Sequence, residues 1–279
     1  MPDQVDSSVL SETTEPTVPG EPTEPTEVSD SACRNWLFEI SRRLNRSFDD
    51  RASMRFETYV RMLRQWNEKI NLTAITDDEG IAVRHLLDSL TLLAPIERYE
   101  QEQKKRHAGR VPHLRLVDVG TGAGFPGLPL KIIRPDWDVL LLDSLAKRLG
   151  FLEAVIKELA LEDIHTWHDR AEDAGHRQDL RGQFDLVTAR AVAPLPVLCE
   201  YCLPLLHRDG LFLAMKGNPD AEWPGAAHAV RILGGELDRI EAFTLPGTDM
   251  QRSIIVIRKI GPTPDLYPRK AGKPEKQPL

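Results

Sequence analysis

The sequence LRLVDVGTGAGFPG (residues 114–127), followed by a helical segment and then by VLLLD (residues 139–143), decides the fold of this chain. A short apolar run that is rich in Leu and Val and bounded by glycines is typical of a buried parallel strand. The glycines that follow let the backbone turn sharply and leave no side chain between it and a ligand. The stretch therefore predicts a strand, a glycine loop, a helix, a second strand and an acid at the end of that strand.

The predicted helix links the glycine loop to the second strand. Pro126 suits the first turn of a helix, where its missing N–H costs nothing. We expect the helix over Gly127–Ile133, ending near Pro135, as a right-handed crossover. Asp143 then lies beside the glycine loop, where open α/β sheets bind ligands, and its carboxylate is placed to accept hydrogen bonds from ribose hydroxyls.

Two classes of nucleotide cofactor use this arrangement. The run from Gly122 to Gly127 matches the G-x-G-x-x-G of dinucleotide binders, which alone is a weak signal. Asp118 precedes the loop and would repel a pyrophosphate, whereas S-adenosylmethionine carries an ammonium and a sulfonium that a carboxylate attracts. The pattern D-x-G-x-G-x-G therefore favours S-adenosylmethionine over NAD. The alternative is a glycine turn that binds nothing, with Asp143 only capping the helix that follows.

Composition sets the class of protein and isolates the N-terminus. The 279 residues, 41% of them hydrophobic, suffice for a sizeable core and one or two domains. No apolar run approaches the ~18 residues of a membrane span and no signal peptide is recognisable, so we expect a cytoplasmic protein without membrane contact. Residues 1–30 hold eight of the 43 acids, five prolines and no Lys or Arg. We predict that this Glu/Pro/Thr-rich segment is disordered and that the remainder, with 36 basic residues, is near neutral.

A helical region is expected between this tail and the first strand. Apolar residues at helical spacing predict two helices between Ala32 and Asn67, separated near Asp49. A further helix contains Arg84–Leu90, and the charged segment Glu100–Pro112 is predicted to be a linker. Residues 31–110 therefore form a helical N-terminal region with its linker.

Strands and helices alternate from residue 111 to residue 261, which predicts a mostly parallel sheet. The last two predicted strands, 237–244 and 253–260, have no helix between them and should form an antiparallel hairpin at one edge. The fold class is thus an α/β, Rossmann-like methyltransferase domain with a seven-stranded sheet. The last segment, 262–279, has five prolines and four Lys or Arg against two acids, and we predict a basic tail that lies along the domain or along RNA.

The residue types narrow the chemistry of methyl transfer. Cys199 and Cys202 form a single C-x-x-C inside a helical run, so buried thiols are expected rather than zinc ligands or any other metal site. None of the three cysteines follows a proline, as cytosine C5 methylation generally requires, and the Asn/Asp-Pro-Pro-aromatic signature of adenine amino-methylation is absent after the fourth strand. What remains is a nucleophile that needs no deprotonation, such as guanine N7, for which proximity and orientation supply most of the acceleration.

Two cations are candidates for positioning the substrate. Arg190 and Lys216 follow the ends of the predicted fourth and fifth strands, where substrate groups gather in this architecture. Arg190 is suited to guanine O6, a phosphate or the cofactor carboxylate. The alternative is a structural ion pair between Arg190 and a neighbouring acid such as Glu172 or Asp185.

From Trp66 to Leu279, the chain resembles the family of bacterial ribosomal RNA small subunit methyltransferase G, also called glucose-inhibited division protein B. The resemblance rests on the motifs WNEKINLT (66–73), RHLLDS (84–89), DVGTGAGFPG (118–127), LDS (142–144), RAE (170–172), RA (190–191) and YPR (267–269). It implies methyl transfer from S-adenosylmethionine to N7 of a guanine in the decoding region of 16S rRNA. The acidic N-terminal segment is not part of the family's pattern.

The resemblance also implies site residues and partners. Its cofactor contacts carry over to Gly120, Phe125, Ala171, Glu172 and Arg190, whereas Gly122 and Asp143 are expected at the cofactor from the loop and strand pattern. The implied partner is 16S rRNA in the small ribosomal subunit or in its assembly intermediate, and nothing in the sequence demands a second chain, so we expect a monomer. The N-terminal helices, Lys104–Arg106 and the C-terminal tail are candidate RNA-binding patches. Two other classes stay open at this point: an NAD-dependent oxidoreductase, and an RNA-binding assembly factor that keeps the fold without turnover.

Overall fold

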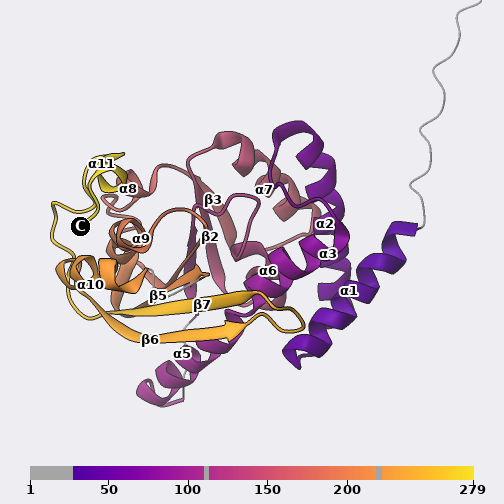
Figure 1. Cartoon of the computed structure of the whole chain (residues 1–279), viewed down its shortest axis with the longest axis horizontal. Coiled ribbons are helices and arrows are strands. Elements are labelled where there is room, and N and C mark those ends of the chain that lie inside the picture. Colours follow the sequence, from indigo (N-terminus) through magenta and orange to yellow (C-terminus); the bar gives the residue numbers. More distant parts are fainter. Residues whose placement is uncertain (1–27, 110–112, 218–221) are drawn as a thin grey trace, which may run out of the picture.

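The computed structural model describes residues 28–109, 113–217 and 222–279. The predicted acidic tail lies outside the described residues except for its last positions, where the first helix already begins at Val28. Figure 1 shows the N-terminal helices at one end of the molecule and α8 to α11 at the other, with the sheet between them.

One sheet of seven strands organises the described chain, in the order β3-β2-β1-β4-β5-β7-β6. The strands are β1 (Arg115–Val119), β2 (Asp138–Asp143), β3 (Ile164–His168), β4 (Phe184–Arg190), β5 (Leu206–Lys216), β6 (Gly235–Thr244) and β7 (Gln251–Lys259). The first five strands pair in parallel, whereas β7 runs antiparallel to both β5 and β6. This confirms the predicted mostly parallel sheet with an antiparallel edge hairpin, the Rossmann-like methyltransferase fold.

Helices precede and cover the sheet. They are α1 (Val28–Leu44), α2 (Asp50–Ile70), α3 (Asp78–Gly80), the π-helix η1 (Ile81–Leu87), α4 (Asp88–Leu90), α5 (Leu93–Arg106), α6 (Gly127–Ile133), α7 (Ala146–Glu158), α8 (Ala171–Ala174), α9 (Leu195–Cys202), the 3₁₀-helix η2 (Leu203–Leu205), α10 (Trp223–Ile232) and α11 (Lys273–Lys276). The predicted break near Asp49 is confirmed, because Asp49 caps α2 by accepting the Ala52 N–H. None of the helices in the described part of the chain has the length and apolarity that a bilayer crossing requires.

The predicted linker is largely wrong, because α5 continues to Arg106. One face of this stretch buries Tyr99 and Gln103. Two acids of α5 form ion pairs with arginines outside the helix. Glu100 lies 2.6 Å from Arg134, and Glu102 lies 3.0 Å from Arg258 of β7. The high charge density of the segment therefore reflects paired side chains on a packed helix, which composition alone does not distinguish from a linker.

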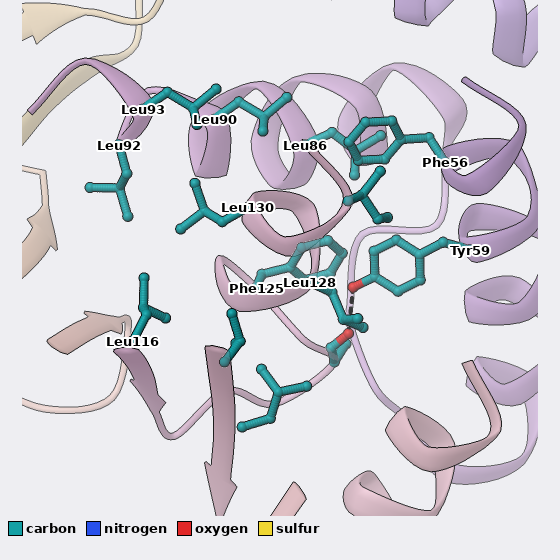
Figure 2. Close-up of a cluster of buried hydrophobic side chains, with 14 of the residues drawn as sticks. Phe56, Tyr59, Leu86, Leu90, Leu92, Leu93, Leu116, Phe125, Leu128 and Leu130 are labelled. Carbon is teal, nitrogen blue, oxygen red and sulfur yellow. Dashed lines mark hydrogen bonds between the residues drawn. The ribbon is translucent and has the colours of Figure 1, made fainter. Parts of the chain in front are cut away.

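The N-terminal helices share one hydrophobic core with a face of the sheet, and the other face has a second core under α9 and α10. Alternate β1 residues divide between them, Leu116 in the first and Val117 in the second. Figure 2 shows Tyr59 of α2 beside Phe125 of the glycine-loop region, and the centroids of the two rings are 5.4 Å apart. The helical region is therefore a direct support of the glycine loop.

The C-terminal segment 262–279 also packs against the sheet domain. Arg181 Nη2 donates to the Thr263 carbonyl over 2.8 Å, and its Nη1 donates to the Tyr267 carbonyl over 2.9 Å. Of the two placements predicted for the tail, along the domain or along RNA, these contacts show the first.

Candidate active site

The glycine loop follows β1 as predicted. Gly120, Gly122 and Gly124 have φ of +69°, +61° and +100°, which favours glycine at all three positions. A Cβ on Gly120 would lie 2.6 Å from Cγ2 of Val192, so only glycine lets these two segments approach. On the other side, Tyr59 of α2 donates its hydroxyl to the Ala123 carbonyl over 2.5 Å (Figure 2).

Asp118 holds the loop together from below. Its side chain is fully buried and accepts Thr121 Oγ1 at 2.6 Å, Thr188 Oγ1 at 2.9 Å and Gly127 N–H at 3.0 Å. Desolvation raises the pKa of the Asp118 carboxyl above its ordinary value, although these hydrogen bonds oppose the rise. Asp118 thus lies beneath the loop, with its oxygens bonded to neighbouring hydroxyl groups and a backbone amide, and its predicted attraction for a cationic ligand stays a prediction.

Asp143 ends β2 beside the loop, as predicted. Its Oδ2 accepts the Gly122 N–H at 2.9 Å, and its Oδ1 accepts the Leu145 N–H, also at 2.9 Å. Arg148 approaches Oδ2 to 3.4 Å. The carboxylate thus caps the turn into α7, as the structural alternative expected, and it also fixes the glycine loop and lines a pocket.

This pocket has a volume of about 260 Å³ and lies at the carboxyl ends of β1 and β2. We call it the cofactor pocket after the ligand that its charges and shape suit. Its walls include Val119, Gly120, Leu142, Asp143, Ser144, Arg148, Asp169, Arg170, Ala171, Glu172, Ala191, Val192, Tyr201 and Glu275. The described residues of these walls include four carboxylates, of Asp143, Asp169, Glu172 and Glu275, and two guanidinium groups, of Arg148 and Arg170. The surplus of negative charge and the side-chain-free cradle at Gly120 fit a cationic sulfonium cofactor, and they disfavour the pyrophosphate of NAD.

Glu172 and Ala171 begin the short helix α8 at one wall of this pocket. Glu172 is only 5% exposed, and its Oε1 accepts the Gly272 N–H at 2.9 Å and the Tyr201 hydroxyl at 3.3 Å. Burial raises the pKa of Tyr201, and the carboxylate of Glu172 adds to the rise. Of the predicted cofactor residues, Gly120, Asp143, Ala171 and Glu172 line the pocket, whereas Gly122, Phe125 and Arg190 lie outside its walls.

A second and larger pocket of about 530 Å³ adjoins the first. This cationic pocket is formed by Ile75, Arg84, His85, Asp88, Arg190, Ala191, Met215, Lys216, Gly217, Phe243, Met250, Arg252, Ser253 and Ile254. Among the described residues of its wall, four Lys or Arg side chains accompany one carboxylate, that of Asp88, and most of the others are apolar. Ala191 belongs to both pockets and has a left-handed φ of +57°, a strained conformation of the kind found at functional sites.

Arg190 is the last residue of β4 and lines the cationic pocket. Its Nη1 donates to the Arg84 carbonyl over 2.9 Å and lies 3.3 Å from Oδ2 of Asp88. The ion-pair partner that the sequence suggested, Glu172 or Asp185, is therefore wrong. Asp88 also accepts Arg252 Nε at 3.2 Å, so one buried carboxylate holds two guanidinium groups at the wall of the pocket.

Lys216 ends β5 and also lines the cationic pocket. Its ammonium donates to the Ala193 carbonyl over 2.6 Å and lies 3.1 Å from Oε1 of Glu222. Both predicted cations thus belong to the ends of their strands, rather than lying just beyond them. The structure brings them together at one pocket, but Lys216 already has two partners.

Phe125 and His85 support Arg190. The His85 ring stacks on Phe125 with centroids 4.4 Å apart, and Arg190 Cζ lies 5.2 Å from the centroid of the same ring. Burial, with Arg190 nearby, lowers the pKa of His85 to about 4, so its imidazole is neutral at pH 7. Nδ1 faces Arg190, which can only donate, and Nε2 lies 2.8 Å from Thr73 Oγ1, which it can reach as a donor. His85 is thus a core histidine with a hydrogen-bonding partner at each ring nitrogen.

Sequence reasoning missed Arg252 as a site residue. It lies on β7, and the antiparallel register places the next residue, Ser253, opposite Lys216 of β5. No local motif marks this arginine, because only the pairing of the sheet brings it to the pocket. Cys199 and Cys202 are buried, and burial raises the pKa of both thiols. The described residues contain no group of His, Cys, Asp and Glu that could hold a metal ion.

Comparison with known proteins identifies relatives over most of the chain. Residues 52–255 match the model of the GidB family, described as rRNA small subunit methyltransferase G. Ribosomal RNA small subunit methyltransferase G of Acetivibrio thermocellus is 47% identical over 246 residues, which cover 88% of this chain and 96% of that protein. The Bacillus velezensis protein of the same name is 46% identical over 234 residues, covering 84% of this chain and 93% of that protein.

These matches confirm the predicted resemblance. They also confirm that the chain is an rRNA methyltransferase and that its cofactor is S-adenosylmethionine, not NAD. The family match spans the glycine loop, Asp143, Glu172, Arg190, Lys216 and Arg252, so it includes both pockets apart from Glu275. The chain therefore belongs to the rRNA small subunit methyltransferase G family.

Proposed function

We propose that this protein transfers a methyl group from S-adenosylmethionine to N7 of a guanine in 16S rRNA. The observation that carries the proposal is the meeting of an acidic pocket and a cationic pocket at Ala191, within a member of this family. A cationic cofactor suits the first pocket, and an anionic, aromatic substrate suits the second. When bound, the cofactor supplies an electrophilic methyl group, and N7 of guanine attacks it with a lone pair that needs no base.

The roles of the residues follow from their charges and surroundings. Gly120 leaves room for the cofactor, and Asp143 and Glu172 offer carboxylate oxygens to its hydroxyl and amino groups. Arg190 presents hydrogen-bond donors to guanine O6 or to a neighbouring phosphate, held by Asp88 on one side and by Phe125 and His85 beneath. Lys216 adds positive charge at the wall.

The apolar side chains of the cationic pocket suit a flat base. Met215, Phe243, Met250 and Ile254 supply van der Waals contact with such a ring. The strand-end cations then supply the polar contacts that fix its orientation. Orientation is the main requirement of this reaction, because attack must be in line with the methyl–sulfur bond.

The form of the substrate is a further part of the proposal. We infer that the protein acts as a monomer on the small ribosomal subunit or on its assembly intermediate.

Methyl transfer tests the proposal directly. Radiolabelled S-adenosylmethionine is supplied with small subunits, precursor particles or naked 16S rRNA from cells that lack this protein, and N7-methylguanine is located by chemical cleavage. Wild type is compared with Gly120→Asp, which places a carboxylate in the cofactor pocket, and with Arg190→Ala. Lys157→Ala, an exposed cation at the end of α7 away from both pockets, is the matched control.

The expected result is labelling at a guanine N7 by wild type and by Lys157→Ala, no labelling by Gly120→Asp, and strongly reduced labelling by Arg190→Ala. Labelling of a different base or a different atom would contradict the guanine-N7 assignment. If none of the three substrates is labelled by a protein that binds S-adenosylmethionine, the ribosomal substrate is wrong.

A further inference from the structure

The C-terminal segment 262–279, which we call the strap, reaches the cofactor pocket from the far edge of the sheet. After β7 it passes Arg181, whose guanidinium donates to three of its carbonyl groups, those of Thr263, Pro264 and Tyr267. His176 contacts the Pro268 carbonyl at 2.6 Å. Figure 1 shows the strap ending at α11, beside α8 and α9.

A buried ion pair anchors the middle of the strap. Glu200 of α9 is 0% exposed, and Arg269 Nη2 lies 2.6 Å from its Oε2. The backbone N–H of Arg269 donates to Oε1 of the same carboxylate, also over 2.6 Å. Bonding through both side chain and backbone fixes the position of the chain at this point, only a few residues from the pocket.

The end of the strap contributes to the cofactor pocket itself. The Gly272 N–H donates to Oε1 of Glu172 over 2.9 Å, and Glu275 forms part of the wall. Tyr201 donates its hydroxyl to that same oxygen over 3.3 Å. Both donors thus bind the same oxygen, Oε1. None of the described residues donates a hydrogen bond to Oε2, so this oxygen is available to a ligand in the pocket that Glu172 lines.

We propose that the strap determines the nucleoside specificity of the cofactor site, with Gly272 as a positioning residue that acts through Glu172. By holding Oε1, the Gly272 N–H aims Oε2 at the exocyclic amino group of the adenine. A carboxylate accepts hydrogen bonds and does not donate them, so it attracts an amino group and repels the oxo group of a purine such as hypoxanthine. This inference rests on the proposed use of S-adenosylmethionine and adds a residue and a recognition rule to it.

The inference is tested by equilibrium binding, without turnover. Isothermal titration of the full-length protein compares S-adenosylhomocysteine with S-inosylhomocysteine, in which an oxo group replaces the amino group. Wild type should bind the adenosyl compound about tenfold to a hundredfold more tightly, as expected from one hydrogen bond to a charged acceptor. A chain that ends after Arg269 keeps the anchor and loses Gly272 and Glu275. It should bind the adenosyl compound about tenfold more weakly and the inosyl compound nearly as wild type does.

A point variant keeps the test valid if the shortened chain fails to fold. Gly272→Ala places a Cβ where no atom lies within 4 Å, but at a φ of +77° that an L-residue rarely adopts, so the N–H should turn away from Glu172. Gly261→Ala is the matched control, because its Cβ also meets nothing within 4 Å and its φ is not left-handed. Gly272→Ala should lose the preference for adenosine, and Gly261→Ala should keep it.

The outcomes separate the inference from the proposed function. A wild-type protein that binds neither compound would overturn the use of this cofactor. A wild-type protein that prefers the adenosyl compound, with a preference that the shortened chain and Gly272→Ala retain in full, would overturn the role of the strap alone. Equal weakening toward both compounds would also count against it, because that result indicates a merely structural role.

Discussion

Replacing Gly120 by alanine tests how closely the glycine loop and the segment after β4 enclose the cofactor pocket. The new Cβ would lie 2.6 Å from Cγ2 and 3.2 Å from Cγ1 of Val192. Val192 is β-branched, so it cannot simply rotate away from both contacts. Because Gly120 and Val192 both line the pocket, displacement of Val192 changes the shape of the cofactor site.

Gly122→Ala is the control for Gly120→Ala, because it introduces the same backbone strain without a steric clash. Its φ of +61° is close to the +69° of Gly120, but the nearest atom to its Cβ, the Gly120 carbonyl oxygen, is 4.0 Å away. Each alanine costs roughly 1–2 kcal/mol in left-handed strain. Overpacking at Gly120 adds about 1–3 kcal/mol. We therefore expect Gly120→Ala to bind S-adenosylhomocysteine about tenfold to a hundredfold more weakly than Gly122→Ala does.

Val192→Ala completes the comparison. It removes both clashing atoms, and Val192 is already 39% exposed, so the single change should cost little stability. The double variant Gly120→Ala, Val192→Ala should bind S-adenosylhomocysteine about as well as Gly122→Ala does, which corresponds to a coupling energy of at least about 1 kcal/mol. Isothermal titration measures binding, and urea unfolding shows that each variant is folded. Equal affinities for Gly120→Ala and Gly122→Ala, or no recovery in the double variant, would refute the reasoning.

Three further predictions concern the supports of the site. Because the pKa of His85 is lowered from 6.5 to about 4, the unfolded chain binds a proton that the folded protein does not, so stability should fall as pH falls from 6.5 toward 4. Urea unfolding of His85→Gln should show a weaker pH dependence over that range. Arg269→Ala should lower the free energy of unfolding by about 3–5 kcal/mol, because Glu200 is then buried without its partner; a change below 1 kcal/mol would contradict burial of the pair. Tyr59→Phe should lower the free energy of unfolding by about 1–3 kcal/mol, because the Ala123 carbonyl loses its hydrogen bond. It should also weaken S-adenosylhomocysteine binding, because the glycine loop loses this support. An unchanged affinity in titration would contradict a role of α2 in supporting the cofactor pocket.

Local patterns predicted the centre of the fold well. The strand, glycine loop, helix and second strand between residues 114 and 143 follow directly from periodicity, glycine and proline, and α6 has the predicted bounds Gly127–Ile133. The positions of Asp143, Arg190 and Lys216 at strand ends follow from the same patterns. Each of these predictions depends on neighbours in the sequence, or on the rule that parallel strands end at one edge.

Contacts between distant segments could not be predicted in this way. Asp88, Arg190 and Arg252 come from a helix, a parallel strand and an antiparallel strand, and only the folded sheet brings them together. Similarly, the composition of residues 262–279 indicates a tail, whereas the buried carboxylates of Glu172 and Glu200 provide the partners that hold it. A proline-rich segment without a hydrophobic pattern can still be well ordered when buried acids accept its N–H groups.

The near-neutral charge of the chain beyond its acidic tail is compatible with an RNA substrate because the charges are segregated. In the N-terminal helical region, three arginines are paired with acids: Arg43 with Glu39, Arg46 with Glu97 and Arg64 with Asp78. The predicted basic patch there is thus largely neutralised within the chain, although such surface pairs contribute at most about 1 kcal/mol each and can be exchanged for contacts with phosphate. The described residues of the cationic pocket include four cations and one carboxylate, so this part of the chain has a local excess of positive charge where the strands end. Clefts focus the electrostatic potential of the charges that line them. This local excess of positive charge, and not the net charge of the chain, therefore attracts a substrate phosphate or guanine to the cationic pocket, beside the cofactor pocket.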